Sequence, residues 1–237
     1  MIDLPNSKNN IISILSGGLD STILTYLLTA KYGKDKVIAL TFNYAQRHYV
    51  ELYKSKKTCQ KLGIHQKILD IEFFGELTEN VSALSKKSKI DMPKIQDVLG
   101  DPQPVSYVPY RNMLFITLAL SFAESNNADN VFIGVQSCDL YNYWDTTPEF
   151  IDRINNVSML NRKNQIIINA PFVDLTKKDE ILLGNDLGVD FSLTHTCYNP
   201  DELYRSCGTC PSCAERIKNF IDAGMIDPIE YQIDINW

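Results

Sequence analysis

The fold follows from one stretch near the N-terminus, Ile11-Ile12-Ser13-Ile14-Leu15-Ser16-Gly17-Gly18-Leu19-Asp20-Ser21. Its first five residues are mostly apolar and β-branched, which predicts a buried strand. From Ser21 to Lys31, apolar side chains recur at helical spacing, which predicts a helix closed by Gly33. A strand that passes through Ser-Gly-Gly into a helix gathers backbone N–H groups and the positive helix end around one point. The stretch therefore predicts an anion site.

The same alternation continues along the chain and predicts an α/β fold. Val37 to Phe42 and Gln66 to Ile71 are predicted strands, with a helix from Gln46 to Leu62 between them. This order predicts a mainly parallel, doubly wound, Rossmann-like sheet with helices on both faces. Further strands are predicted at Asn130–Val135 and Ile166–Ile168, and further helices at Asn112–Glu124, Pro148–Leu160, Lys177–Leu187 and Ala214–Ala223.

The segment from Phe73 to Val108 matches neither the helical nor the strand period, and several prolines interrupt it. A loop of this length in a compact domain is usually a functional cover or a disordered insert, and both readings stay open.

Length, charge and composition favour an enzyme with a small substrate. The 237 residues, 44% of them hydrophobic, suffice for one large core, and we expect a main domain at 1–195 and a C-terminal element at 196–237. A net charge of −6 disfavours direct nucleic-acid binding. The start, Met1 to Lys8, is polar, and no apolar run approaches the roughly 18 residues of a membrane span. We therefore expect a cytoplasmic protein without membrane contact.

The residues around the two glycines suit a nucleotide phosphate. Gly17 and Gly18 remove side chains where phosphate oxygens approach the backbone, and Ser16 and Ser21 add hydroxyl donors. The Asp20 carboxylate can hold Mg²⁺ beside the phosphates. No lysine follows the glycines, so this is not a Walker loop. The competing interpretation is a turn in which Ser16 or Asp20 only caps a helix. The predicted ATP-binding run comprises Leu15, Ser16, Gly17, Gly18, Leu19, Asp20, Ser21, Thr22, Ile23, Leu24 and Thr25.

Four of the six cysteines fall close together near the C-terminus, as Cys197, Cys207, Cys210 and Cys213. The spacing C-x9-C-x2-C-x2-C suits a closed tetrahedral zinc site, with Gly208 allowing the chain to fold back. The run C-x2-C-x2-C also occurs in iron–sulfur proteins, so spacing alone does not decide the metal. We predict one structural Zn²⁺ held by four thiolates.

These motifs together resemble a known family. The loop is similar to the SGGxDS pyrophosphate loop of the N-type ATP pyrophosphatases, the PP-loop superfamily with its adenine nucleotide alpha-hydrolase-like fold. From about Ile11 to Phe220 the chain resembles the 7-cyano-7-deazaguanine synthases, the QueC family of queuosine biosynthesis. The residues that carry this resemblance are Ser16–Thr22, Tyr44, Gln46-Arg47-His48, Val108-Pro109, Arg111-Asn112, Gly134-Val135, Asp139, Tyr143, Asp145, Lys178, Glu180, Thr196-Cys197-Tyr198 and the three later cysteines.

The resemblance implies an ATP-dependent ligase that joins 7-carboxy-7-deazaguanine and ammonia. An acyl-adenylate and an amide would precede the nitrile, with ATP, Mg²⁺ and Zn²⁺ as cofactors and a homodimer as the assembly. The catalytic residues would be Asp20, Ser21, Arg47, Arg111 and Lys178, with the arginines gripping carboxylate or phosphate. The substrate would contact Tyr44, Gln46, His48, Asn112, Asp139, Tyr143 and Asp145.

The chain departs from the family pattern in places that bear on the substrate. Ala45 and Tyr110 stand where the family has glycine, and residues 141–147 keep only the tyrosine and the second aspartate of the usual S-G-Y-P-D-C-R stretch. These departures leave open a different carboxylate or a product that stops at the amide. Two other readings also remain, a tRNA-thiolating relative and a non-catalytic module that senses ATP.

Overall fold

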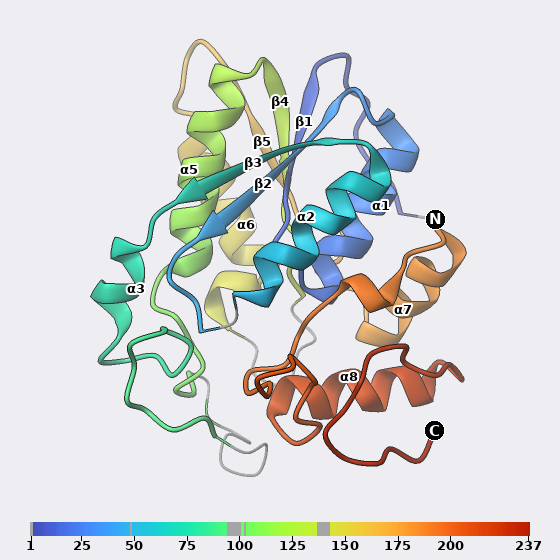
Figure 1. Cartoon of the computed structure of the whole chain (residues 1–237). Helices are drawn as coiled ribbons and strands as arrows, with labels where there is room; N and C mark the ends of the chain where they lie inside the picture. Colours follow the sequence, from blue (N-terminus) through green and yellow to red (C-terminus); the bar gives the residue numbers. More distant parts are fainter. Residues whose placement is uncertain (1, 48, 94–100, 102, 137–142) are drawn as a thin grey trace.

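A computed structural model describes residues 2–47, 49–93, 101, 103–136 and 143–237, and a five-stranded sheet forms its centre (Figure 1). The strand order is β3-β2-β1-β4-β5, and every neighbouring pair is parallel. Ile12 of the central strand lies opposite Ile38 on one side and Val131 on the other. The predicted α/β fold with a parallel sheet is confirmed. The strands are β1 (Asn10–Ile14), β2 (Val37–Asn43), β3 (His65–Asp70), β4 (Ala128–Phe132) and β5 (Ile167–Asn169).

Helices cover both faces of the sheet, as Figure 1 shows. On one face α1 (Leu19–Tyr32) packs on β1 and β2, and α2 (Val50–Leu62) packs on β2 and β3. On the other face α5 (Arg111–Ser125) packs on β1 and β4, and α6 (Pro148–Ser158) on β5. Side chains of a strand alternate between faces, so β1 supplies both cores. Ile12 and Ile14 join the cluster under α5, and Ile11 joins the one under α1.

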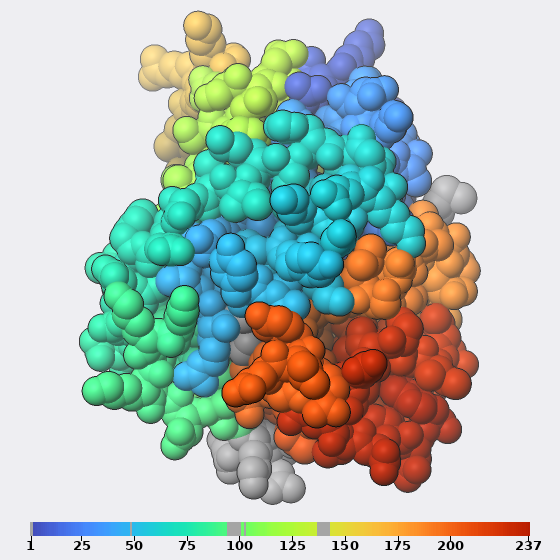
Figure 2. All heavy atoms as spheres, viewed as in Figure 1, coloured from blue at the N-terminus to red at the C-terminus, as the bar shows by residue number. Residues whose placement is uncertain are grey.

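The C-terminal part of the chain packs against the first face. Helix α7 (Lys177–Asp186) contacts α1, and α8 (Pro211–Asp222) contacts α7. In Figure 2 the orange segment near residue 200 lies against the blue and cyan surface of α2. The ammonium of Lys54 on α2 donates to the Ser192 carbonyl oxygen at 2.7 Å. This packing places the cysteine-bearing segment near the start of α2.

The strand order creates a switch point between β1 and β4. The chain moves outward from β1 through β2 to β3 and then returns to the opposite side of β1 as β4. In open α/β sheets, ligands bind outside the carboxyl ends of the strands at such a point. Here the turn after β4 lies close against the start of α1, which follows β1. The approach is so close that a Cβ on Gly134 would lie 3.2 Å from the backbone of Asp20.

Among the differences from the predicted elements, three have a clear physical reason. Phe73–Thr78 forms α3 within the segment predicted to be irregular, because six residues are too few to display a helical period. Helix α2 begins at Val50 instead of Gln46, since the Gln46 side chain accepts from the Tyr44 N–H and holds a turn there. Helix α8 begins at Pro211 instead of Ala214, with proline at the first helical position, where its missing N–H costs nothing.

None of the helices formed by the described residues combines the length and apolar character that crossing a bilayer requires.

Candidate functional site

A cavity of about 250 Å³ opens at the switch point, where the carboxyl ends of β1 and β4 meet the first turns of α1 and α5. Leu84, from the segment after α3, closes part of its wall, and α8 contributes Ser212, Glu215 and Arg216. The cavity brings together residues that are far apart in the sequence. The predicted site residues that line it are Leu15, Ser16, Gly18, Leu19, Asp20, Ser21, Tyr44, Gln46, Arg111, Asn112 and Tyr143.

The phosphate loop is shaped by Gly17 and by two serine hydroxyls. Gly17 has φ +95°, and a Cβ there would lie 2.2 Å from the backbone oxygen of Glu51 on α2. The Ser16 hydroxyl accepts from the Gly18 N–H at 3.1 Å and lies 2.9 Å from the Ser21 hydroxyl. Gly18 is the N-cap of α1, and no side chain caps that helix end. The geometry therefore favours an anion-binding turn over the alternative of a helix capped by Ser16 or Asp20.

The lysine that contacts this loop is Lys177, whereas Lys178 is the lysine that the family resemblance predicts to be catalytic. The Lys177 ammonium lies 2.8 Å from the Asp20 carboxylate, and both residues line the cavity. Lys178 is exposed and does not line it. The phase of α7 explains the difference, because successive side chains on a helix point about 100° apart. The capping box formed by Thr176 and Asp179 fixes where that helix begins.

The second half of the predicted ATP-binding run points away from the cavity. Ile23 and Leu24 belong to the core under α1, and Thr22 is fully buried. The Thr25 hydroxyl bonds to Ser13 at 2.8 Å. These four residues therefore anchor the helix that carries the loop. Gly17 also lies outside the cavity lining, where it shapes the turn.

Arg111 lines the cavity from the start of α5. It begins α5, and the Tyr44 hydroxyl is hydrogen-bonded to its guanidinium. Burial raises the pKa of Tyr44, and the Arg111 charge opposes that shift. Asp145 is 3% exposed and lies outside the cavity lining, but its carboxylate interacts with Arg111. Burial raises the pKa of Asp145, and the Arg111 charge opposes that shift. The Arg111 guanidinium is thus charged and is held in place by Tyr44 and Asp145.

The other predicted residues divide between the cavity and its surroundings. The Asn112 amide donates to the Asp145 carbonyl oxygen at 3.2 Å, and the Tyr143 ring stacks on Tyr107 with centroids 5.7 Å apart. Arg47 lies outside the cavity lining, because its guanidinium donates to the Ser88 carbonyl oxygen at 3.1 Å. The positions predicted for His48 and Asp139 lie outside the described residues.

Several residues that line the cavity escaped the sequence analysis. Glu51 lies beside the phosphate loop, and burial raises the pKa of its carboxyl to about 7 although Arg111 lowers it. Gln136 follows β4 and donates to the fully buried carboxylate of Glu180. His195 donates its backbone N–H to the Gly17 carbonyl oxygen at 2.9 Å. Glu180 lies behind the cavity lining and belongs to the residues of the family resemblance, whereas Glu51, Gln136 and His195 reach the cavity through contacts between distant segments.

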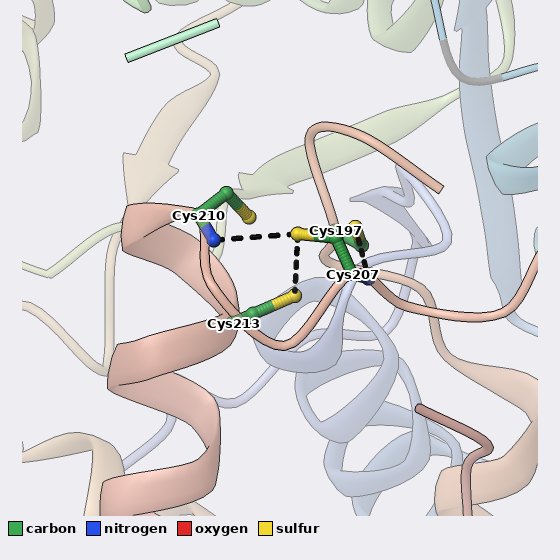
Figure 3. A group of neighbouring side chains, drawn as sticks. All are labelled: Cys197, Cys207, Cys210 and Cys213. Carbon is green, nitrogen blue, oxygen red and sulfur yellow. Dashed lines mark hydrogen bonds between the residues drawn. The ribbon is translucent and has the colours of Figure 1, made fainter. Parts of the chain in front are cut away.

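The four predicted metal ligands form a buried cluster (Figure 3). Their sulfurs all lie within 4.8 Å of one another, and each cysteine is buried. Backbone N–H groups donate to three of the sulfurs, for example that of Cys207 to the Cys197 sulfur at 3.2 Å. Such bonds stabilise thiolates, the form that binds metal. Gly208 has φ +76°, as the predicted reversal of the chain requires. The four cysteines thus fit a metal ion held by thiolates.

Comparison with known proteins identifies the family. The family model of queuosine biosynthesis protein QueC matches residues 10–224. The chain belongs to the QueC family. It is 37% identical to the 7-cyano-7-deazaguanine synthase of Psychrobacter sp. (strain PRwf-1) over 235 residues, which cover 95% of this chain and 91% of that protein. It is 39% identical to the 7-cyano-7-deazaguanine synthase of Caldicellulosiruptor saccharolyticus over 226 residues, which cover 95% and 97% of the two chains.

A more distant likeness concerns the fold alone. The U34-tRNA thiolase NcsA from Methanococcus maripaludis, solved with its [4Fe-4S] cluster, superposes with a TM-score of 0.51 at 17% identity. The superposition covers 92% of this QueC family chain and 67% of the thiolase chain. It supports the predicted α/β architecture with a parallel sheet and says nothing of ligand or substrate.

Proposed function

We propose that this protein is a 7-cyano-7-deazaguanine synthase that converts 7-carboxy-7-deazaguanine and ammonia to the nitrile at the expense of ATP. The observation that carries the proposal is its near-complete alignment, at 37% and 39% identity, with proteins of that name. The cavity at the switch point supports it independently, because it combines a phosphate loop with an arginine on one wall. That pairing suits a reaction between a nucleotide phosphate and a carboxylate.

The residues of the cavity divide the work of carboxylate activation. The loop at Gly17 and Gly18 binds the pyrophosphate part of ATP through backbone N–H groups and the N-terminus of α1. Lys177 neutralises charge that develops on the departing pyrophosphate, and Arg111 holds the substrate carboxylate in line with the α-phosphate. The carboxylate oxygen then attacks the α-phosphorus and pyrophosphate leaves. The resulting acyl-adenylate is the electrophile for ammonia.

The aromatic side chains and amides form the substrate-facing part of the proposed site. The Tyr143 ring, already stacked on Tyr107, offers a flat face to a planar deazapurine. Phe42 stacks on Phe115 with centroids 4.2 Å apart, so the floor of the cavity is also aromatic. Asn112 supplies an amide at the cavity wall. These contacts suit a flat heterocycle.

The cofactors of the proposed enzyme are Zn²⁺ and Mg²⁺. We assign Zn²⁺ to the four cysteines, because the group that the described residues form consists of four buried thiols, which match a closed structural site. The ion would contribute folding energy and rigidity. Mg²⁺ would be held by the Asp20 carboxylate beside the ATP phosphates. Metal analysis tests the zinc assignment, since a [4Fe-4S] centre would give a brown protein with bound iron.

The decisive experiment is mass spectrometry of the product. The purified protein is incubated with 7-carboxy-7-deazaguanine, ammonia, ATP and Mg²⁺. The expected product is the nitrile, with two AMP and two pyrophosphate released for each molecule. A product that accumulates as the amide would restrict the enzyme to the first half of the reaction. The absence of pyrophosphate release with all components present would refute the assignment.

The proposal extends to organisation in the cell. We propose a cytoplasmic homodimer in which residues 1–195 carry the ATP and substrate sites and residues 196–237 form the metal-binding element. The substrates are small molecules, and neither nucleic acid nor a membrane takes part directly. The net charge of −6 supports the absence of nucleic acid. Light scattering of the purified protein tests the dimer.

A further inference from the structure

Glu51 lines the cavity, and the activation of the substrate carboxylate described above assigns no role to its side chain. It is the second residue of α2, and its backbone oxygen faces Gly17 so closely that a Cβ there would lie 2.2 Å away. Its side chain lines the cavity and interacts with Arg111 on the opposite element, α5. Glu51 therefore lies between the loop that binds pyrophosphate and the arginine that holds the substrate carboxylate. On the proposed function, the acyl-adenylate would form between the same loop and the same arginine.

We propose that Glu51 accepts the proton that ammonia loses as it attacks the acyl-adenylate. The nitrogen lone pair forms a bond to the carbonyl carbon, and the bond from that carbon to the oxygen of AMP breaks. The electron pair leaves with AMP, and one N–H proton moves to the Glu51 carboxylate. The products are the amide, AMP and protonated Glu51, which returns its proton to solvent. This inference rests on the proposed function.

The other carboxylates of the cavity suit this task less well. Among the described residues that line it, carboxylates occur at Asp20, Glu51 and Glu215. Asp20 is paired with the Lys177 ammonium at 2.8 Å and lies in the phosphate loop. Glu215 lies on α8, and its charge acts on the Tyr198 hydroxyl. Only Glu51 combines a place next to the loop with an interaction with Arg111.

The environment of Glu51 gives its carboxyl a pKa that suits a general base near neutral pH. Burial raises the pKa of its carboxyl to about 7, and the Arg111 guanidinium opposes the shift. A general base works best when its pKa lies near the working pH. Bound triphosphate raises the pKa further through repulsion between like charges, so departure of pyrophosphate lowers it again. Glu51 is then ready to accept a proton after the adenylate has formed. The other charged or titratable groups that line the same cavity are Asp20, Tyr44, Arg111, Tyr143, Lys177, His195, Tyr198, Glu215 and Arg216.

The test separates adenylation from amination in the full-length, metal-loaded enzyme. Adenylation is measured as exchange between ATP and pyrophosphate with the carboxylate present and ammonia absent. Amination is measured as amide formation at a fixed concentration of un-ionised ammonia. In Glu51→Gln we expect exchange within about threefold of the wild type and amination slower by about 10²- to 10⁴-fold, the usual contribution of a general base. Glu51→Asp should recover part of the amination rate.

The rates of the variants show whether Glu51 acts as the base or in nucleotide binding. If Glu51→Gln loses exchange and amination together, Glu51 serves nucleotide binding and the inference is overturned. If both rates are retained, or if Glu215→Gln shows the selective loss instead, the inference is also overturned. The wild-type amination rate should rise with pH through about 7, because only the ionised Glu51 accepts a proton, and Glu51→Gln should remove that rise. If the wild type shows no exchange that depends on the carboxylate, the proposed function itself fails.

Discussion

Replacing Gly17 by alanine tests whether the phosphate loop depends on its contact with the start of α2. Gly17 has φ +95°, and a backbone of this kind costs roughly 1–3 kcal/mol for residues other than glycine. The new Cβ would also lie 2.2 Å from the Glu51 backbone oxygen, against 3.4 Å for an ordinary contact. Either the loop or α2 must therefore move by roughly 1 Å, and a misplacement of that size in a catalytic site lowers rates by about 100-fold.

Gly33→Ala is the matched control for this variant. Gly33 ends α1 with φ +86°, and a Cβ there meets nothing within 4 Å. Both variants should therefore lose stability, at roughly 2–4 °C of melting temperature for each kcal/mol. Only Gly17→Ala should also lose about 100-fold in ATP–pyrophosphate exchange. Equal exchange rates in two folded variants would refute the argument that the loop is shaped against α2.

Three further variants test other contacts. Lys177→Ala should lower ATP–pyrophosphate exchange about tenfold or more, because the variant removes a charged donor from the phosphate loop. Lys178→Ala should lower the exchange rate less. The opposite order would make Lys178 the catalytic lysine, as the family resemblance predicts. Cys210→Ser should lose metal and melting temperature together, and a folded variant that keeps its metal would contradict a four-thiolate site. Asp227→Ala should lower the free energy of unfolding by about 3–5 kcal/mol, because the variant leaves the buried Arg216 guanidinium without its carboxylate partner. Denaturant titration measures this change. A loss under about 1 kcal/mol would contradict the reasoning.

The parts of the site that could be predicted from the sequence are those encoded in one continuous stretch. The phosphate loop lies between a strand and a helix that adjoin it in the chain, so local patterns suffice to find it. The cysteine cluster was also predictable, because three of its members, Cys207, Cys210 and Cys213, fall within one short segment. Both predictions concern residues whose spacing in the chain largely determines their spacing in the fold.

Residues that depend on the phase or docking of a helix could not be found in this way. Lys177 and Lys178 are adjacent, and only the starting point of α7 decides which one faces the loop. Glu51 faces the cavity because α2 begins at Val50 and docks against Gly17. Arg47 carries a family signal, but its guanidinium turns to the Ser88 carbonyl oxygen. Sequence patterns place such residues near the site without fixing which way they point.

The cysteine-bearing segment contacts the phosphate loop through His195. None of the described residues that line the cavity is a cysteine, yet the two sites share this residue. His195 donates its backbone N–H to the Gly17 carbonyl oxygen at 2.9 Å, and its ring Nε2 lies 3.1 Å from the Cys197 carbonyl oxygen. Arg216 on α8 adds a second link, since it donates to the Thr194 hydroxyl at 2.8 Å. A metal ion bound by the four cysteines would therefore hold in place the segment that donates to Gly17, and we expect loss of the metal to alter the shape of the phosphate loop.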